Sequence, residues 1–300
     1  MLTTAADTYL AVRRASGFAL RNQGFQLKSF AAFSEARGHH YIHAAIAIEW
    51  AGLGQSGLQR ARRLGTVIRF ARYLHAEDER HEVPPAIFGT ENARRPTPYI
   101  LTTTDIRRLI TAAAQSMSRA ICGATYSTLF ALLSCTGLRV SEAIRLRMDD
   151  ITPDGLVIQR TKFRKSRLVP LHETARAGLE RYLQQRRRYA PLADHVFVSV
   201  VRKPLRSADV DRAFRIAARE AGLPNRPRRP TPHALRHAFA TRALSTCPDG
   251  RDAITRHMLA LSTYLGHSSV AHTYWYLQAV PDLMRNIAEQ AERLATGGRP

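Results

Sequence analysis

Four short motifs in the second part of the chain combine cationic, imidazole and phenol side chains at close spacing. The first is TGLRVSE at residues 136–142. Gly137 is a natural helix terminator, so we expect Arg139 at the entry of the next helix, beside backbone N–H groups that favour anions. Glu142 follows three residues later and can fix the Arg139 guanidinium. A surface ion pair is the commoner interpretation of an isolated Arg–Glu pair, and it stays open.

The second motif is TKFRKSR at residues 161–167, in a chain that strongly prefers arginine to lysine. Only four of its 45 basic residues are lysines, and two of them, Lys162 and Lys165, lie in this motif. A lysine whose pKa is lowered by nearby cations can act as a general acid, whereas arginine keeps its proton. Lys162 is therefore a candidate acid, and a solvated hairpin tip is the alternative.

The third motif is TPHALRH, which follows a basic, proline-rich run. We expect Thr231 as N-cap and Pro232 as the first helical residue. His233 and Arg236 then share one face of the first turn, where both can meet an anion. His237 is expected to point elsewhere, in a structural role. A packing histidine is the commoner case for His233 as well, and that alternative stays open.

The fourth motif is LGHSSVAHTYWY, which begins at Leu265 and contains His267 and Tyr276. Residues nine apart on one continuous helix project to opposite sides. The two side chains can therefore meet only if Gly266 and the serines after it break the helix. Zinc binding by His267 and His272 is disfavoured, because no cysteine or acidic cluster accompanies them. We expect no metal ion and no cofactor.

Together the motifs supply two arginines, a lysine, two histidines and a tyrosine. This set suits metal-free phosphoryl transfer, in which a tyrosine attacks, cations hold the non-bridging oxygens and an acid protonates the leaving oxygen. Charge favours the same chemistry: 45 Lys and Arg against 24 Asp and Glu give a formal net charge of +21. Such an excess predicts a polyanionic partner, most simply nucleic acid.

The 300 residues are 45% hydrophobic, which excludes a disordered or fibrous chain and allows one large domain or two modest ones. A membrane surface is the weaker alternative partner. The sequence has no run of about 18 apolar residues, and its start lacks the features of a signal peptide. We therefore expect no membrane partner and a cytoplasmic, nucleoid-associated protein.

The elements that must position these motifs are predicted to be mostly helical. Residues 1–90 carry apolar side chains at helical spacing, interrupted by glycines at 24, 38 and 52–57, as in a bundle of about four helices. The last of these helices is rich in arginine and presents either a phosphate-contacting or a merely solvated face. Residues 91–99 are polar and contain two prolines, which predicts an interdomain linker.

Residues 100–300 are predicted to form the second domain. Thr102 and Asp105 have capping-box spacing, so the domain should open with a helix. Two segments rich in β-branched residues, at 156–160 and 167–171, flank a basic turn and predict a hairpin. A last helix is expected at about 281–294. The fold class is thus mainly α with a small antiparallel β-sheet.

The four motifs, in this order, resemble those of the tyrosine recombinases, the family of lambda integrase, Cre and the Xer proteins. The shared features are TGLR-x-SE, a lysine before RLVPL, H-x-LRH, and LGH followed nine residues later by tyrosine. The resemblance covers about residues 100–295. It implies a catalytic recombinase domain at 100–300, and a helical, SAM-like core-binding domain at 1–90 that resembles the family in size and position only.

The resemblance also implies a role for each candidate residue. Tyr276 would attack the scissile phosphate and form a 3′-phosphotyrosine, while Lys162 protonates the leaving 5′ oxygen. His233 would assist proton transfer at the tyrosine. Tyr274 lies two residues before Tyr276, and only the nine-residue spacing from His267 selects Tyr276 as the nucleophile.

The remaining candidates would hold the phosphate. Arg139 and Arg236 would clamp it, His267 would hydrogen-bond it, and Glu142 would support the constellation. The implied partners are double-stranded DNA recombination sites and further copies of the chain, as a dimer on each site and a tetramer in the synapse. Accessory DNA-bending or directionality proteins are a further implied class of partner.

The leading hypothesis is a site-specific DNA recombinase or integrase that needs no ATP. The segments TYWYL and PDLM resemble integrases of transposons and other mobile elements, which favours integration or transposition. One alternative is an enzyme like type IB topoisomerases, which have similar catalytic residues. The other is a DNA-binding accessory protein without catalysis.

Overall fold

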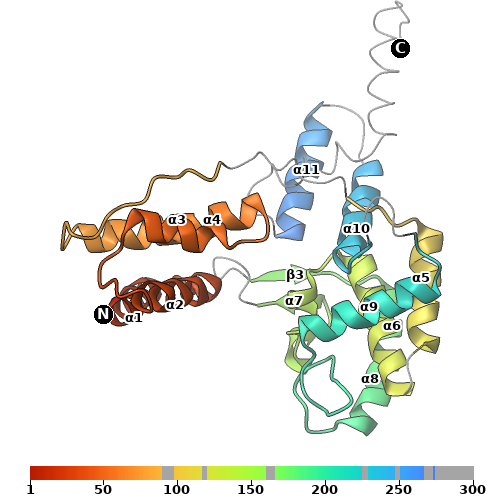
Figure 1. Ribbon diagram of the computed structural model, residues 1–300. Coiled ribbons are helices and arrows are strands. Elements are labelled where there is room, and N and C mark those ends of the chain that lie inside the picture. The colour runs from red at the N-terminus through yellow and green to blue at the C-terminus, as the bar shows by residue number, and fades with distance from the viewer. Residues whose placement is uncertain are drawn as a thin grey trace, which may run out of the picture. The chain divides into compact units, whose positions relative to one another are not determined.

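The computed structural model of the chain describes residues 1–89, 98–116, 120–159, 166–224, 229–246, 251–266 and 273. It comprises two compact units, Met1–Pro96 and Thr97–Pro300. Their boundary falls inside the proline-containing segment 91–99. In Figure 1 the first unit is coloured red to orange and the second yellow to blue.

The first unit is built from four helices around one apolar core. These are α1 (Leu2–Ala15), α2 (Arg21–Glu35), α3 (Ala44–Gly52) and α4 (Gly57–His75). Leu27, Phe30 and Phe70, which the helical spacing selected, are fully buried in this core. Gly24 lies inside α2 and does not interrupt it, which corrects the expectation, because the helix continues through it with Gly24 packed near Leu10 of α1.

The second unit is also mainly helical. Its elements are α5 (Thr103–Gln115), α6 (Ala120–Thr136), α7 (Val140–Ala143), η1 (Met148–Asp150), β1 (Ile151–Thr152), β2 (Gly155–Ile158), β3 (Arg167–Val169), α8 (Glu173–Tyr189), α9 (Ser207–Glu220), α10 (His233–Ser245) and α11 (Arg251–Leu265).

Helix α6 is the centre of this unit, and it packs against α5, α8, α9 and α10 (Figure 1). The predicted capping box at the start of α5 is confirmed: the Thr102 hydroxyl accepts the Asp105 N–H, and the Asp105 carboxylate accepts the Thr102 N–H. Helix α5 approaches α6 so closely that a Cβ added to Gly123 would lie 2.4 Å from the carbonyl oxygen of Ala114. Glycine at 123 therefore allows the two helices to touch.

A three-stranded antiparallel sheet, with strand order β1-β2-β3, lies beside the helices. The expected hairpin is present as β2 and β3, whereas β1 was not foreseen because its two residues are too few to show a pattern. The register pairs Ile158 with Arg167 and Leu156 with Val169. A Cβ on Gly155 would lie 2.3 Å from the Val169 carbonyl oxygen, so only glycine fits there. The mainly α fold with a small antiparallel sheet is confirmed.

Helices α10 and α11 pack side by side through their own apolar cluster, which comprises Ala240, Leu244, Met258, Leu261 and Leu265. This packing brings the C-terminal end of α11 toward the first turn of α10. In the part of the chain that the structure describes, no helix has the length and apolar character needed to span a membrane. The helix expected at about 281–294 lies outside the described residues.

Candidate active site

Arg139 and Glu142 lie where α6 gives way to α7. Helix α6 ends at Thr136, and Gly137 reverses the chain with φ +62°, which L residues rarely adopt. Arg139 is then the N-cap of α7. The expected position is confirmed, but α7 is a single turn of four residues, too short to supply much of a helix dipole. Any anion held here must therefore be held mainly by side chains.

The Glu142 carboxylate holds Arg139 at two points. One oxygen accepts the backbone N–H of Arg139 at 2.9 Å, and the other accepts its guanidinium at 2.8 Å. The Glu142 side chain is only 10% exposed, which is incompatible with a solvated surface pair, whereas that of Arg139 is 34% exposed. A ligand can therefore reach Arg139 while Glu142 stays behind it.

Arg167, which the sequence did not suggest, is the second partner of Glu142. Its guanidinium donates to both carboxylate oxygens, at 3.1 and 2.9 Å, in a bidentate pair. Burial raises the pKa of Glu142, but the hydrogen bonds from Arg167 and Arg139 and their positive charges lower it to about 2. Glu142 is thus ionised throughout the physiological range. Nothing in the RLVPL segment except its leading arginine could have signalled this contact.

Arg236 approaches the same region from the first turn of α10. It is 2% exposed, and its guanidinium donates to the Gly137 carbonyl at 2.7 Å and the Leu265 carbonyl at 2.8 Å. Arg139 donates to the next carbonyl, that of Gly266, at 2.9 Å. Two arginines from different helices thus meet consecutive carbonyls at the end of α11.

His233 lies one turn before Arg236, although α10 begins one residue later than expected. Pro232 is its N-cap rather than its first helical residue; it has helical dihedral angles, and its carbonyl accepts the N–H of Leu235 at 3.2 Å. Burial of the His233 ring is the main cause that lowers its pKa to about 4, and the positive charges of Arg236 and Arg139 add to the effect. His233 is therefore neutral at pH 7, with an imidazole nitrogen free of the extra proton, and at this pKa it is a weak base.

His237 does not point elsewhere, which corrects the sequence-based expectation. Its ring lies 4.3 Å from that of His233, centroid to centroid, in an edge-to-face contact. The reason is helical geometry, since residues four apart lie one above the other on the same face. Burial, and then the charges of His233 and Arg236, lower the pKa of His237 to about 3.

We call Arg139, Glu142, Arg167 and Arg236 the arginine cluster. Three guanidinium cations and one carboxylate give it a net charge of +2 at neutral pH. The neutral His233 adds no charge but can move a proton. Such an arrangement suits binding of a phosphodiester and stabilisation of the extra charge that develops on it during transfer.

Three predicted site residues, Lys162, His267 and Tyr276, lie outside the described residues. The structure reaches the segment just before His267: α11 ends at Leu265, and Gly266 has φ +64°. Helix α11 therefore ends at Gly266, as expected, and the serines that were expected to complete the break lie outside the described residues. Within the described ranges, no group of three or more His, Cys, Asp or Glu side chains is placed to hold a metal ion.

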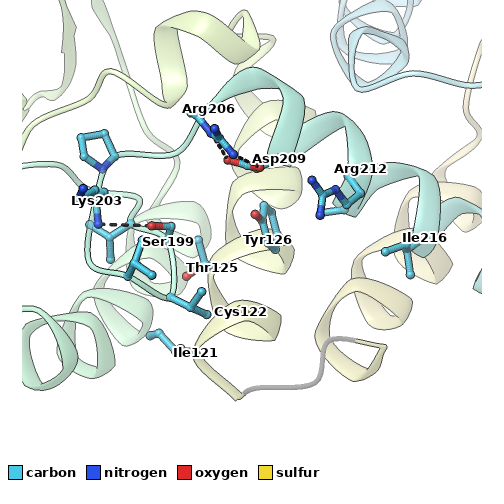
Figure 2. A pocket seen from close by; sticks show the side chains of 15 residues that line it. Ile121, Cys122, Thr125, Tyr126, Ser199, Lys203, Arg206, Asp209, Arg212 and Ile216 are labelled. Atoms are coloured by element: carbon cyan, nitrogen blue, oxygen red, sulfur yellow. Dashed lines mark hydrogen bonds and ion pairs between the residues drawn. The ribbon is translucent and has the colours of Figure 1, made fainter.

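A cavity of about 670 Å³ lies elsewhere in the second unit, between α6, α9 and the segment 198–206 (Figure 2). It is lined mainly by apolar side chains, and none of the predicted site residues is among them. Figure 2 shows the ion pair of Arg206 with Asp209, 2.9 Å long, at its edge, and Tyr126 beneath it. Burial raises the pKa of Tyr126 to about 12, so this phenol stays protonated.

Comparison with known proteins adds a family relation to this geometry. The sequence model described as "Phage integrase family" matches residues 100–281. A putative integrase/recombinase of Sinorhizobium fredii is 37% identical over 96% of this chain and 96% of its own. The tyrosine recombinase XerD of Caulobacter vibrioides is 30% identical over 95% of this chain and 94% of its own.

Solved structures agree in fold. The Tn1549 transposon integrase in complex with transposon right end DNA aligns with a TM-score of 0.68 at 18% identity, over 96% of this chain and 98% of its own. A lambda integrase dimer bound to a COC′ core site aligns with a TM-score of 0.63 at 20% identity, over 92% of this chain and 76% of its own. At these identities the likeness is one of fold.

Proposed function

Since this chain belongs to the phage integrase family, the family of tyrosine recombinases, we propose that it breaks and rejoins DNA at specific sites through a 3′-phosphotyrosine intermediate. We further propose that it serves the integration or transposition of a mobile element. The segments TYWYL and PDLM favour this role over chromosome-dimer resolution, as does the 37% identical relative named as an integrase/recombinase.

One observation carries the proposal. Arg139 and Arg236 come from different helices, yet their guanidinium groups meet the consecutive carbonyls of Gly266 and Leu265. Both cations therefore lie at the two residues that precede His267 in the sequence. Two cations that converge on one point can share the non-bridging oxygens of a phosphodiester. The net charge of +2 on the arginine cluster favours such an anion.

In the proposed reaction, the Tyr276 oxygen forms a bond to the scissile phosphorus and the bond from phosphorus to the 5′ oxygen breaks. The tyrosine proton passes to His233, which is unprotonated at pH 7. Lys162 gives a proton to the departing 5′ oxygen. Attack by the 5′-hydroxyl of another strand reverses these steps, and the phosphotyrosine conserves the bond energy, so no ATP is needed.

The proposal assigns DNA binding to both units, with residues 1–90 as core-binding domain, 91–99 as linker and 100–300 as catalytic domain. Helix α4 presents three exposed arginines along one face, Arg62, Arg69 and Arg72, which we call the α4 arginine stripe. Arg63, in contrast, stacks on Trp50 at 4.0 Å and serves packing. We assign the stripe to phosphate contacts and propose that copies of the chain pair on DNA, as a dimer on each site and a tetramer in the synapse.

The deciding experiment is capture of DNA that stays bound to the protein after denaturation in cells, followed by sequencing. Wild type is compared with Tyr276→Phe, and Tyr274→Phe is the matched control. Adducts at a few sequences that vanish only in Tyr276→Phe are expected, and they would reveal the crossover site. Adducts dispersed over unrelated DNA would favour a topoisomerase, and an adduct that survives Tyr276→Phe would move the nucleophile.

A further inference from the structure

Arg167 is the one member of the arginine cluster to which the proposed function assigns no role. It begins β3, and its register opposite Ile158 of β2 holds it at the edge of the sheet. Its side chain is 13% exposed, so it is largely withdrawn from solvent. Taking a guanidinium out of water is costly, and the chain retains it in a cluster that is already positive.

The four hydrogen bonds that reach the Glu142 carboxylate form a symmetrical pattern. Oε1 accepts one guanidinium N–H of Arg167 and one of Arg139, at 3.1 and 2.8 Å. Oε2 accepts the other N–H of the Arg167 pair and the backbone N–H of Arg139, both at 2.9 Å. Each carboxylate oxygen is therefore shared by both arginines, and Arg167 fixes the plane in which Arg139 is held.

Arg167 also lies against the backbone that precedes His267. A Cβ built on Gly266 would lie 2.9 Å from Nη1 of Arg167 and 3.3 Å from its Cζ, but 3.6 Å from Nη1 of Arg139. Gly266 is the residue whose carbonyl accepts from Arg139. The Arg167 guanidinium thus bonds the carboxylate that holds Arg139 and lies close to Gly266, the residue whose carbonyl accepts from Arg139.

We propose that Arg167 is a positioning residue for DNA cleavage, which acts through Glu142 to hold the Arg139 guanidinium in the orientation that receives the scissile phosphate. This inference rests on the proposed recombinase function. A planar fork is essential to it, because only a guanidinium can bond both oxygens of one carboxylate side by side, and a lysine ammonium is a single point charge.

The test uses the full-length protein and a duplex of its crossover site, nicked so that cleavage releases a short fragment and traps the phosphotyrosine. DNA affinity and the rate of trapping at saturating protein are measured separately for Arg167→Lys and Arg167→Met. The control is Arg176→Met, because Arg176 holds the carbonyls of Thr152 and Pro153 beside the same sheet and does not contact Glu142.

We expect trapping to slow by about 100-fold in Arg167→Met, as when a reacting group is misplaced by about 1 Å, and to a smaller extent in Arg167→Lys. DNA affinity should stay within about twofold, because most phosphate contacts are made elsewhere. Arg176→Met should trap at the wild-type rate. An equal loss in the control would make the effect one of sheet stability and overturn the proposal.

A double-variant cycle tests the path through Glu142. In a Glu142→Gln background, Arg167→Met should slow trapping by less than about threefold, because its target is already altered. If the double variant slows trapping by the product of the two single-variant effects, the proposal is overturned. Trapping at the wild-type rate in Arg167→Met would overturn it as well. If wild type traps no DNA, the recombinase function fails and this inference fails with it; wild-type trapping with no effect at Arg167 refutes the inference alone.

Discussion

Substitution of Gly266 by alanine adds one Cβ atom beside the candidate active site, and the same substitution at Gly222 is a matched control. Gly266 and Gly222 both have φ +64°. A Cβ on Gly222 would meet nothing within 4 Å, whereas one on Gly266 would lie 2.9 Å from the Arg167 guanidinium. The two alanine variants therefore share the same backbone strain, and they differ in the contact with Arg167.

The shared cost is that of a left-handed backbone at an L residue, about 1–2 kcal/mol. For a unit of about 200 residues this lowers the melting temperature by about 2–8 °C. Gly266→Ala carries an added effect, because the Arg167 guanidinium must move while both of its hydrogen bonds to Glu142 hold it in place. We expect that movement to disturb Arg139 and to slow DNA cleavage by at least about tenfold.

The assay is the trapping of covalent adduct on a nicked crossover-site duplex, with the melting temperature of each variant measured in parallel. Gly222→Ala should lose stability and keep the wild-type cleavage rate. Gly266→Ala should lose a similar amount of stability and most of its cleavage rate. Equal cleavage by the two variants, at whatever stability, would refute the inference that the guanidinium of Arg167 must stay where it is.

Three further results are expected. Lowering the pH from about 6.5 toward 4 should lower the melting temperature. The pKa values of His233 and His237, about 4 and 3 in the folded protein, are below those of the unfolded chain, so in this range the unfolded chain binds protons that the folded chain does not. His237→Gln should weaken this pH dependence, and a melting temperature that does not change with pH would contradict the prediction. Gly123→Ala should lower the free energy of unfolding by about 1–3 kcal/mol in chemical denaturation, by forcing α5 from α6. Gly178→Ala on α8, where a Cβ would meet only the Arg181 guanidinium at 3.8 Å, should raise it by about 0.5–1 kcal/mol; the reverse order would mean that the helix contact is not tight. Replacing the three residues of the α4 arginine stripe by glutamine should weaken DNA binding and reduce the slope of log K against log salt concentration by up to about 3. An unchanged slope would show that the stripe does not contact DNA phosphates.

Local sequence was sufficient wherever a feature depends on neighbours along the chain. The capping box of α5 joins residues three apart, and the contact of Arg139 with Glu142 has the same spacing. The end of α11 at Gly266 and the hairpin of β2 and β3 are equally local. These features follow from helix and turn geometry, which a short segment specifies by itself.

Local patterns were less informative about the direction of His237 and about the length of the helix after Arg139. His237 was expected to point elsewhere, yet its ring meets that of His233 edge to face because residues four apart share a helix face. The helix after Arg139 was expected to offer an anion site at its N-terminus, but α7 is a single turn of four residues that packs against α6 and α9. How far a helix continues depends on what surrounds its end.

Sequence alone determined the fold class, the family and the residue types needed for phosphoryl transfer, because each motif carries its chemistry within a few residues. Tertiary structure alone decided which of those residues meet. Arg236 reaches the carbonyl of Gly137 across 99 positions of sequence, and Arg167 reaches Glu142 across 25. Contacts of this kind arise when helices and strands pack into one core, and no local pattern encodes which arginine of 41 will lie beside a given carboxylate.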